Sequence, residues 1–282
     1  MQWFGRRESS NVDDRRGITG GQVAVGGGVL GVIFLIAQFL LGGGDVSDIQ
    51  QTFPQGEQRE MTAEEKAADD QMASFVKVVL ADTEDVWDKV FAEQGKQYSK
   101  PFLVLFRGGT QSGCGNATSA GGPFYCPGDQ RVYIDLSFAE DLKNRFNAAG
   151  DFAMAYVVAH EVGHHVQYLL GVASKMDRLR QSVSETEYNK YSVMMELQAD
   201  FYSGLWAHYD DKMKNVLDKD DIEEALNAAN AIGDDRLQRE SQGQVTPDAF
   251  THGTSAQRMY WFKKGYDTGD ISQGNTFEGT EL

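Results

Sequence analysis

The chain is poor in basic residues and nearly free of cysteine. Its 26 lysines and arginines face 42 aspartates and glutamates, which gives a formal net charge of −16 over 282 residues. That balance argues against binding to nucleic acid, whose phosphates require a basic surface, and against close adhesion to anionic lipid headgroups. Two cysteines are too few for a metal site made of cysteine alone, and the lack of an internal repeat argues against a repeat protein.

Histidine is also scarce, with five in the whole chain, yet His160 and His164 enclose Glu161 in an H-E-x-x-H motif. Composition alone makes this pattern a chance event of about one in a hundred. The mostly apolar residues 152–159 and 166–170 flank it, which predicts one helix of roughly 18 residues. Side chains four positions apart share a helix face, so both imidazoles can bind one metal ion beside Glu161. The pattern is typical of zinc peptidases; the alternative, two hydrogen-bonded core histidines, would bury polar groups at a cost.

Two histidines leave such a site one ligand short, because a catalytic zinc ion has three protein ligands and one open position. Residues 194–204 predict a second, largely buried helix, on which Glu196 and Asp200 lie four positions apart on one face. We expect Glu196 to complete the ligand set and Asp200 to accept the free ring N–H of His160. The alternative is an exposed acidic face, against which the apolar neighbours argue.

Three other side chains bear on this site. His165 points about a third of a turn away from His164, so we expect it to support the site or lie at the surface rather than bind metal. His252 lies in a loop before a predicted helix that carries Arg258. These two could stabilise a developing oxyanion, or they could simply belong to a packed helix start, and the sequence leaves both interpretations open.

Three segments together resemble the bacterial neutral zinc metallopeptidase family: HEVGHH at 160–165, ELQADFYSG at 196–204 and HGTSAQR at 252–258. More broadly, the chain is similar to gluzincins, in which H-E-x-x-H is followed by E-x-x-x-D, and residues 6–17 resemble the start of the same family. The resemblance implies one Zn²⁺ per chain. It implies the following roles: His160, His164 and Glu196 as metal ligands, Glu161 as catalytic base, and Asp200 as the partner of a ligand. His252 and Arg258 match the family's later segment, and we list both as candidate catalytic groups.

The one long apolar run, residues 23–41, is just long enough to span a bilayer as a helix. Four arginines precede it: Arg6, Arg7, Arg15 and Arg16. No basic residue follows it before residue 59, so the positive-inside rule predicts a single-pass anchor at 21–43 in the bacterial inner membrane. Residues 1–20 would then be cytoplasmic and the remainder periplasmic. A cleaved signal peptide is the alternative, but the run is longer than usual and no A-x-A site follows it.

The two cysteines, Cys114 and Cys126, lie in a loop rich in glycine, serine, asparagine and proline. An oxidising compartment would join them in a disulfide, which would contribute roughly 3 kcal/mol of stability. A pair of free thiols is the alternative, and the choice between them depends on the topology.

We predict an α+β fold, with a mainly helical, zincin-like metallopeptidase domain at 62–270 and a small β-sheet. The domain follows a linker at 44–61 and precedes a flexible tail at 271–282. Local patterns predict the following elements: a helix from a capping box at Thr62 to about residue 93, strands at 102–106 and 131–136, helices at 137–149 and 220–232, and a polar loop at 233–244. In gluzincin-like folds an edge strand pairs with substrate, and we place that strand at 132–136 or in the loop before it.

These features predict a membrane-anchored zinc endopeptidase that acts on peptide or protein substrates and has no nucleic-acid partner. The alternative is a non-catalytic, zinc-containing envelope protein with a binding or chaperone-like role and latent or lost peptidase activity. Glu161 favours catalysis, because a purely structural zinc site does not need it and usually closes its fourth position.

Overall fold

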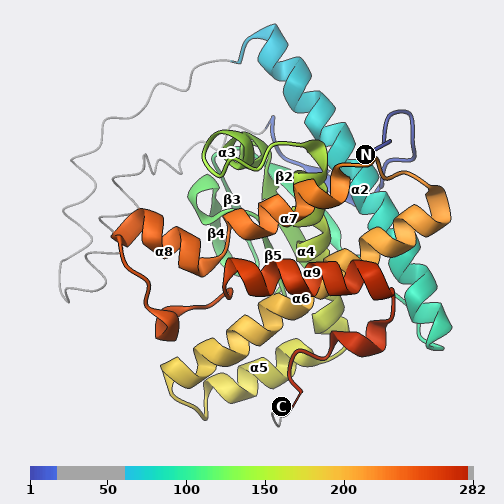
Figure 1. Cartoon of the computed structure of the whole chain (residues 1–282). Coiled ribbons are helices and arrows are strands. Elements are labelled where there is room, and N and C mark those ends of the chain that lie inside the picture. Colours follow the sequence, from blue (N-terminus) through green and yellow to red (C-terminus); the bar gives the residue numbers. More distant parts are fainter. Residues whose placement is uncertain (18–60, 279–282) are drawn as a thin grey trace.

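A small mixed sheet lies at the centre of the protein and includes residues from the start of the chain. The computed structural model describes residues 1–17 and 61–278 (Figure 1). The strands lie in the order β1 (Val12–Asp14), β2 (Phe102–Phe106), β6 (Arg131–Asp135) and β5 (Phe124–Cys126). The first three are parallel, and β5 runs antiparallel to β6 at one edge. The predicted mainly helical α+β fold is confirmed, as are the two predicted strands, which are β2 and β6.

The two faces of the sheet meet different partners, because side chains alternate along each strand. Leu103 and Leu105 join the main core, together with helices α2 (Ala63–Glu93) and α4 (Asp151–Leu169). Val104 and Phe106 point the other way, toward the hairpin of β3 (Gly109–Ser112) and β4 (Gly115–Thr118). The predicted capping box at Thr62 begins α2.

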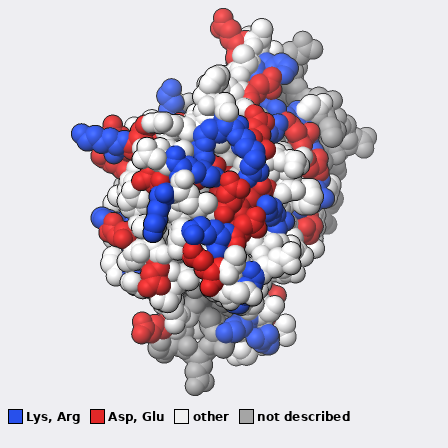
Figure 2. Space-filling model, turned by 90° about the vertical axis from the view of Figure 1, so that its right-hand side faces the viewer, with Lys and Arg blue, Asp and Glu red and all other residues white. Residues whose placement is uncertain are grey.

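Residues 1–17 belong to this folded body, whereas a separate segment was expected at 1–20. Val12 of β1 lies opposite Leu103 of β2. The four arginines before the apolar run make ion pairs here: Arg6 with Asp82, Arg7 with Glu84 and Asp85, Arg15 with Asp13, and Arg16 with Asp14 and Asp69. On the face shown in Figure 2, basic and acidic side chains interleave rather than gather by sign. Sequence patterns missed β1 because a three-residue strand with two aspartates shows no periodicity.

The helical part is built around α4, which packs against α2, α6 (Glu185–Lys214) and α7 (Asp221–Ala231). Helix α5 (Val172–Arg180) follows α4, and α9 (Ser255–Thr268) lies along α6 (Figure 1). Glycines allow α6 and α9 to approach closely: a methyl group on Gly204 would lie 1.9 Å from the carbonyl oxygen of Phe262. This contact brings the C-terminal helix against the helix that carries Glu196.

Several predicted boundaries were wrong. The polar loop expected at 233–244 contains α8 (Asp234–Gln242), and the helix expected at 137–149 is shorter, forming α3 (Phe138–Asn144). The tail expected to be flexible from 271 begins with a 3-10 helix (Ile271–Gly274), and Phe277 is buried. These segments make isolated contacts, so they lack the apolar periodicity on which sequence prediction depends.

The predicted anchor at 21–43 lies outside the described residues, as does the linker up to residue 60. Among the residues that the structure does describe, no helix is both long and apolar enough to cross a membrane. The predicted disulfide joins Cys114, in the loop between β3 and β4, to Cys126 of β5.

Candidate metal centre

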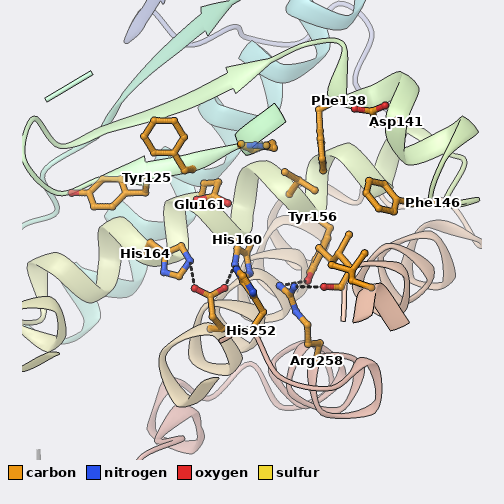
Figure 3. Close-up of a pocket in the computed structure, with 18 of the residues that line it drawn as sticks. Tyr125, Phe138, Asp141, Phe146, Tyr156, His160, Glu161, His164, His252 and Arg258 are labelled. Carbon is orange, nitrogen blue, oxygen red and sulfur yellow. Dashed lines mark hydrogen bonds and ion pairs between the residues drawn. The ribbon is translucent and has the colours of Figure 1, made fainter. Parts of the chain in front are cut away.

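Helices α4 and α6 bring three ligand-type side chains to one point. His160 and His164 lie one turn apart on α4 (Figure 3). Glu196 of α6 faces both rings. The Nε2 atom of His160 lies 3.2 Å from one carboxylate oxygen of Glu196, and that of His164 lies 3.3 Å from the other. The three candidate ligand atoms lie within 4.8 Å of one another. Two imidazole nitrogens and a carboxylate oxygen are a donor set that suits zinc.

Asp200 is fully buried and organises the site from behind His160. The Nδ1 atom of His160 donates to Asp200 over 2.9 Å, so Nε2 is free to present a lone pair to a metal ion. Arg258 donates to both oxygens of Asp200, over 2.9 and 3.0 Å, and the Tyr156 hydroxyl donates over 2.5 Å. Burial opposes the charged form, but Arg258 and His160 hold the pKa of Asp200 below its usual value.

The metal-free cluster holds protons tightly. Burial tends to lower the pKa of His160, but Asp200 and Glu196 outweigh it and raise that pKa to about 10. Burial would raise the pKa of Glu196, but the charges and hydrogen bonds of the two histidines hold it well below its usual value. Metal binding must therefore release a proton from the imidazoles.

Arg258 lines the cavity, but most of its N–H groups are bound to other protein groups. Its side chain is buried, and it donates two hydrogen bonds to Asp200, one to the Tyr156 hydroxyl at 3.2 Å and one to the Ile232 carbonyl at 3.3 Å. Its geometry favours a different role, in which it keeps Asp200 charged and in place. The sequence showed its distance from His252 along the chain but not the direction of its side chain.

Gln167 supports the second histidine and was not identified from the sequence. It is fully buried, and its Oε1 atom accepts a hydrogen bond from His164 Nδ1 over 2.9 Å. Its Nε2 atom donates to the Met195 carbonyl over 2.7 Å. One amide thus links a candidate ligand on α4 to the residue before Glu196 on α6. Its position three residues after His164, on the same helix face, was the available signal.

His252 lies at the same cavity (Figure 3) and has its own carboxylate partner, Asp234. Its Nδ1 atom lies 3.2 Å from Asp234, which also accepts the backbone N–H groups of Thr251, His252 and Gly253. The bond to Asp234 raises the pKa of His252 above its usual value. The Nε2 atom makes no hydrogen bond to a described residue, so this side chain remains suited to stabilising an oxyanion. Asp234 was missed because it begins α8, which was expected to be a loop.

The cavity has a volume of about 570 Å³. Glu161 is in its wall beside the two candidate ligands, together with Phe124 and Tyr125 of β5. The substrate-pairing strand was expected at 132–136 or in the loop before it. The first range is β6, which is flanked by β2 and β5, and the loop before it contains β5, which lies at an edge of the sheet.

An H-E-x-x-H helix with a downstream glutamate on a second helix is the arrangement of zinc metallopeptidases. The chain belongs to the family described as "Putative neutral zinc metallopeptidase", whose model matches residues 1–277. The uncharacterized protein YpfJ of Escherichia coli K12 is 50% identical over 285 residues, covering 98% of this chain and 99% of that protein. The uncharacterized protein Rv2575 of Mycobacterium tuberculosis H37Rv is 41% identical over 218 residues, covering 74% of this chain and 73% of that protein. No solved structure matches the chain.

Proposed function

We propose that the protein is a zinc-dependent endopeptidase of zincin-like architecture. The observation that carries this proposal is the convergence of His160, His164 and Glu196 beside Glu161 in the wall of an open cavity. Zinc, when bound, supplies Lewis acidity at the scissile carbonyl and activates water for attack.

Side chains and backbone of the protein carry out proton transfer, oxyanion stabilisation and peptide binding. Glu161 takes the proton of the attacking water and passes it to the leaving amine. His252, held by Asp234, donates a hydrogen bond from Nε2 to the oxygen that becomes negative. An extended peptide pairs with the open edge of β5, as peptides do at other exposed sheet edges.

The compartment is part of the proposal. A disulfide between Cys114 and Cys126 is typical of proteins outside the reducing cytoplasm, so we place the peptidase domain on the extracytoplasmic side of the bacterial inner membrane. Attachment through 21–43 remains a prediction, because those residues are outside the described part.

Two substitutions test the proposal. Glu161→Gln removes the base but no ligand, so zinc content stays at the wild-type value while hydrolysis of a peptide library falls by about 100-fold or more. Glu196→Ala removes a ligand, so zinc content falls. Zinc is measured by elemental analysis and hydrolysis by mass spectrometry with and without chelator, with the exposed Glu140→Gln as matched control. Undiminished turnover by Glu161→Gln, or a library left uncut by the zinc-loaded wild type, would favour a non-catalytic zinc protein instead.

A further inference from the structure

His165, the neighbour of candidate ligand His164, has both ring nitrogens engaged by protein. Its ring is completely buried. Nε2 lies 2.6 Å from the carbonyl oxygen of Ser99, and Nδ1 lies 3.0 Å from the hydroxyl of Tyr125. A carbonyl can only accept, so Nε2 carries the proton and Nδ1 accepts from Tyr125. With both nitrogens used in this way, His165 is not a metal ligand.

The partner of His165 is on the strand that borders the cavity. β5 has three residues, and its register with β6 places Tyr125 opposite Val132. Among the described strands, β6 is its one partner. Tyr125 lines the cavity beside Glu161 and His164 (Figure 3). The hydroxyl of Tyr125 therefore connects a short edge strand directly to the helix turn that carries a candidate ligand.

We infer that His165 is a positioning residue that fixes the β5 edge at its distance from the metal centre. Its consequence for catalysis rests on the proposed peptidase function, because a less ordered edge would pair more weakly with a bound peptide. Its consequence for the strand itself does not depend on that function.

His165→Phe keeps a ring of similar shape and removes both hydrogen bonds. In the full-length, zinc-loaded protein, amide hydrogen exchange in residues 119–127 becomes about five- to tenfold faster, while α4 and the zinc content are unchanged. With the peptide that the wild type cuts best from a library, KM rises about five- to tenfold and kcat changes less than about twofold. Tyr125→Phe, which removes one bond without creating a cavity, produces the same pattern, and the double variant is no worse than His165→Phe alone.

Tyr98→Phe is the matched control. Its ring lies 5.9 Å from that of His165, but its buried hydroxyl has no hydrogen-bond partner in the described part of the chain. Exchange and KM should both stay at wild-type values. Unchanged exchange at 119–127 in both His165→Phe and Tyr125→Phe would overturn the inference. If the wild type cuts no peptide, the proposed function fails, yet the exchange measurement still decides the role of His165.

A second, independent observation concerns the first seventeen residues. Glu84 is 2% exposed and accepts hydrogen bonds from Ser9 at 2.5 Å, Asn11 at 2.8 Å and Arg7 at 3.1 Å. Asp82, 3% exposed, accepts from Arg6 at 2.7 Å. Without the N-terminal residues, both buried acids of α2 would lose these partners, and β2 would lose its neighbour β1.

We infer that residues 1–17 and the metal-bearing domain occupy the same side of the membrane, an arrangement that is incompatible with the single-pass anchor predicted from the sequence at 21–43. A single crossing between them would separate β1 from β2, which share one sheet. The test uses Phe4→Cys, at a side chain that is 88% exposed, and Glu140→Cys, at an exposed site on α3. Each variant is expressed at full length in Escherichia coli, and intact spheroplasts are treated with a membrane-impermeant maleimide. Both cysteines should react alike, and labelling of Glu140→Cys without Phe4→Cys, or the reverse, would overturn the inference.

Discussion

Removing the Asp200 carboxylate should weaken the protein in two separable ways. Arg258 is 2% exposed and keeps its charge, so Asp200→Ala leaves a buried cation without its anion. Breaking a buried pair in this way costs about 3–5 kcal/mol. For a domain of this size each kcal/mol lowers Tm by about 2–4 °C, so we expect a loss of about 6–20 °C. His160 also loses the acceptor at its Nδ1 atom, and zinc affinity should fall about 10- to 100-fold.

A second substitution separates the two effects. Asp200→Ala combined with Arg258→Met no longer contains a stranded charge, so most of the lost stability should return. Zinc affinity should stay low, because His160 still lacks its acceptor. Thermal unfolding of the metal-free protein measures the first effect, and competition with a chelator at fixed pH measures the second. Asp177→Ala, at an exposed carboxylate, is the control. Recovery of zinc affinity together with Tm would show that Asp200 acts through packing and not through His160.

Three further perturbations test the fold around the site. Burial beside Asp82 raises the pKa of Asp210 to about 7. The folded state therefore holds this proton more tightly than the unfolded state does. The contribution of this proton to the free energy of unfolding is complete below pH 4 and is lost as the pH rises through 7. Asp210→Asn should thus raise Tm at both pH values, by more at pH 8 than at pH 5, whereas the exposed Asp220→Asn should leave Tm nearly unchanged at both. Gly204→Ala should lower Tm and zinc affinity together by pushing α9 from α6, and wild-type values for both would refute the close packing. Cys114→Ser opens a link between residues twelve apart and should lower the urea unfolding free energy by about 3 kcal/mol; no change would mean that the disulfide does not form.

The centre of the site could be predicted because its signals are local and periodic. The helix carrying His160 and His164 was confirmed as α4 within one residue at each end, since apolar residues line nearly its whole length. Glu196 and Asp200 were found for the same reason: four-residue spacing within an apolar helix places both on one face. Their proximity to the first helix came from the family pattern, since nothing in local spacing places α6 against α4.

The supporting groups depend on long-range geometry and were harder to predict. Gln167 and Tyr156 lie on the same helix as the histidines, but their roles depend on where α6 passes. The role of Asp234 as the partner of His252 depends on a turn of the chain that brings His252 back to α8. Arg258 was identified, but its bonds to Asp200 were not predicted, because a guanidinium can turn toward a cavity or toward a carboxylate from the same helix position.

The arginines at the start of the chain show why charge patterns alone are ambiguous. Basic residues before an apolar run are the normal signature of a cytoplasmic flank, and that was the interpretation of Arg6 and Arg16. Acidic residues lie close to these arginines in the sequence, a pattern that also suits ion pairs. In the structure the arginines do form ion pairs, and Arg16 contacts Asp69 on α2 at 2.6 Å. The positive-inside rule counts charges but cannot tell whether each charge is already neutralised by a fold. An arginine that is bound to the domain supplies no independent evidence for the side of the membrane on which it lies, so the topology must be decided by labelling and not by the count.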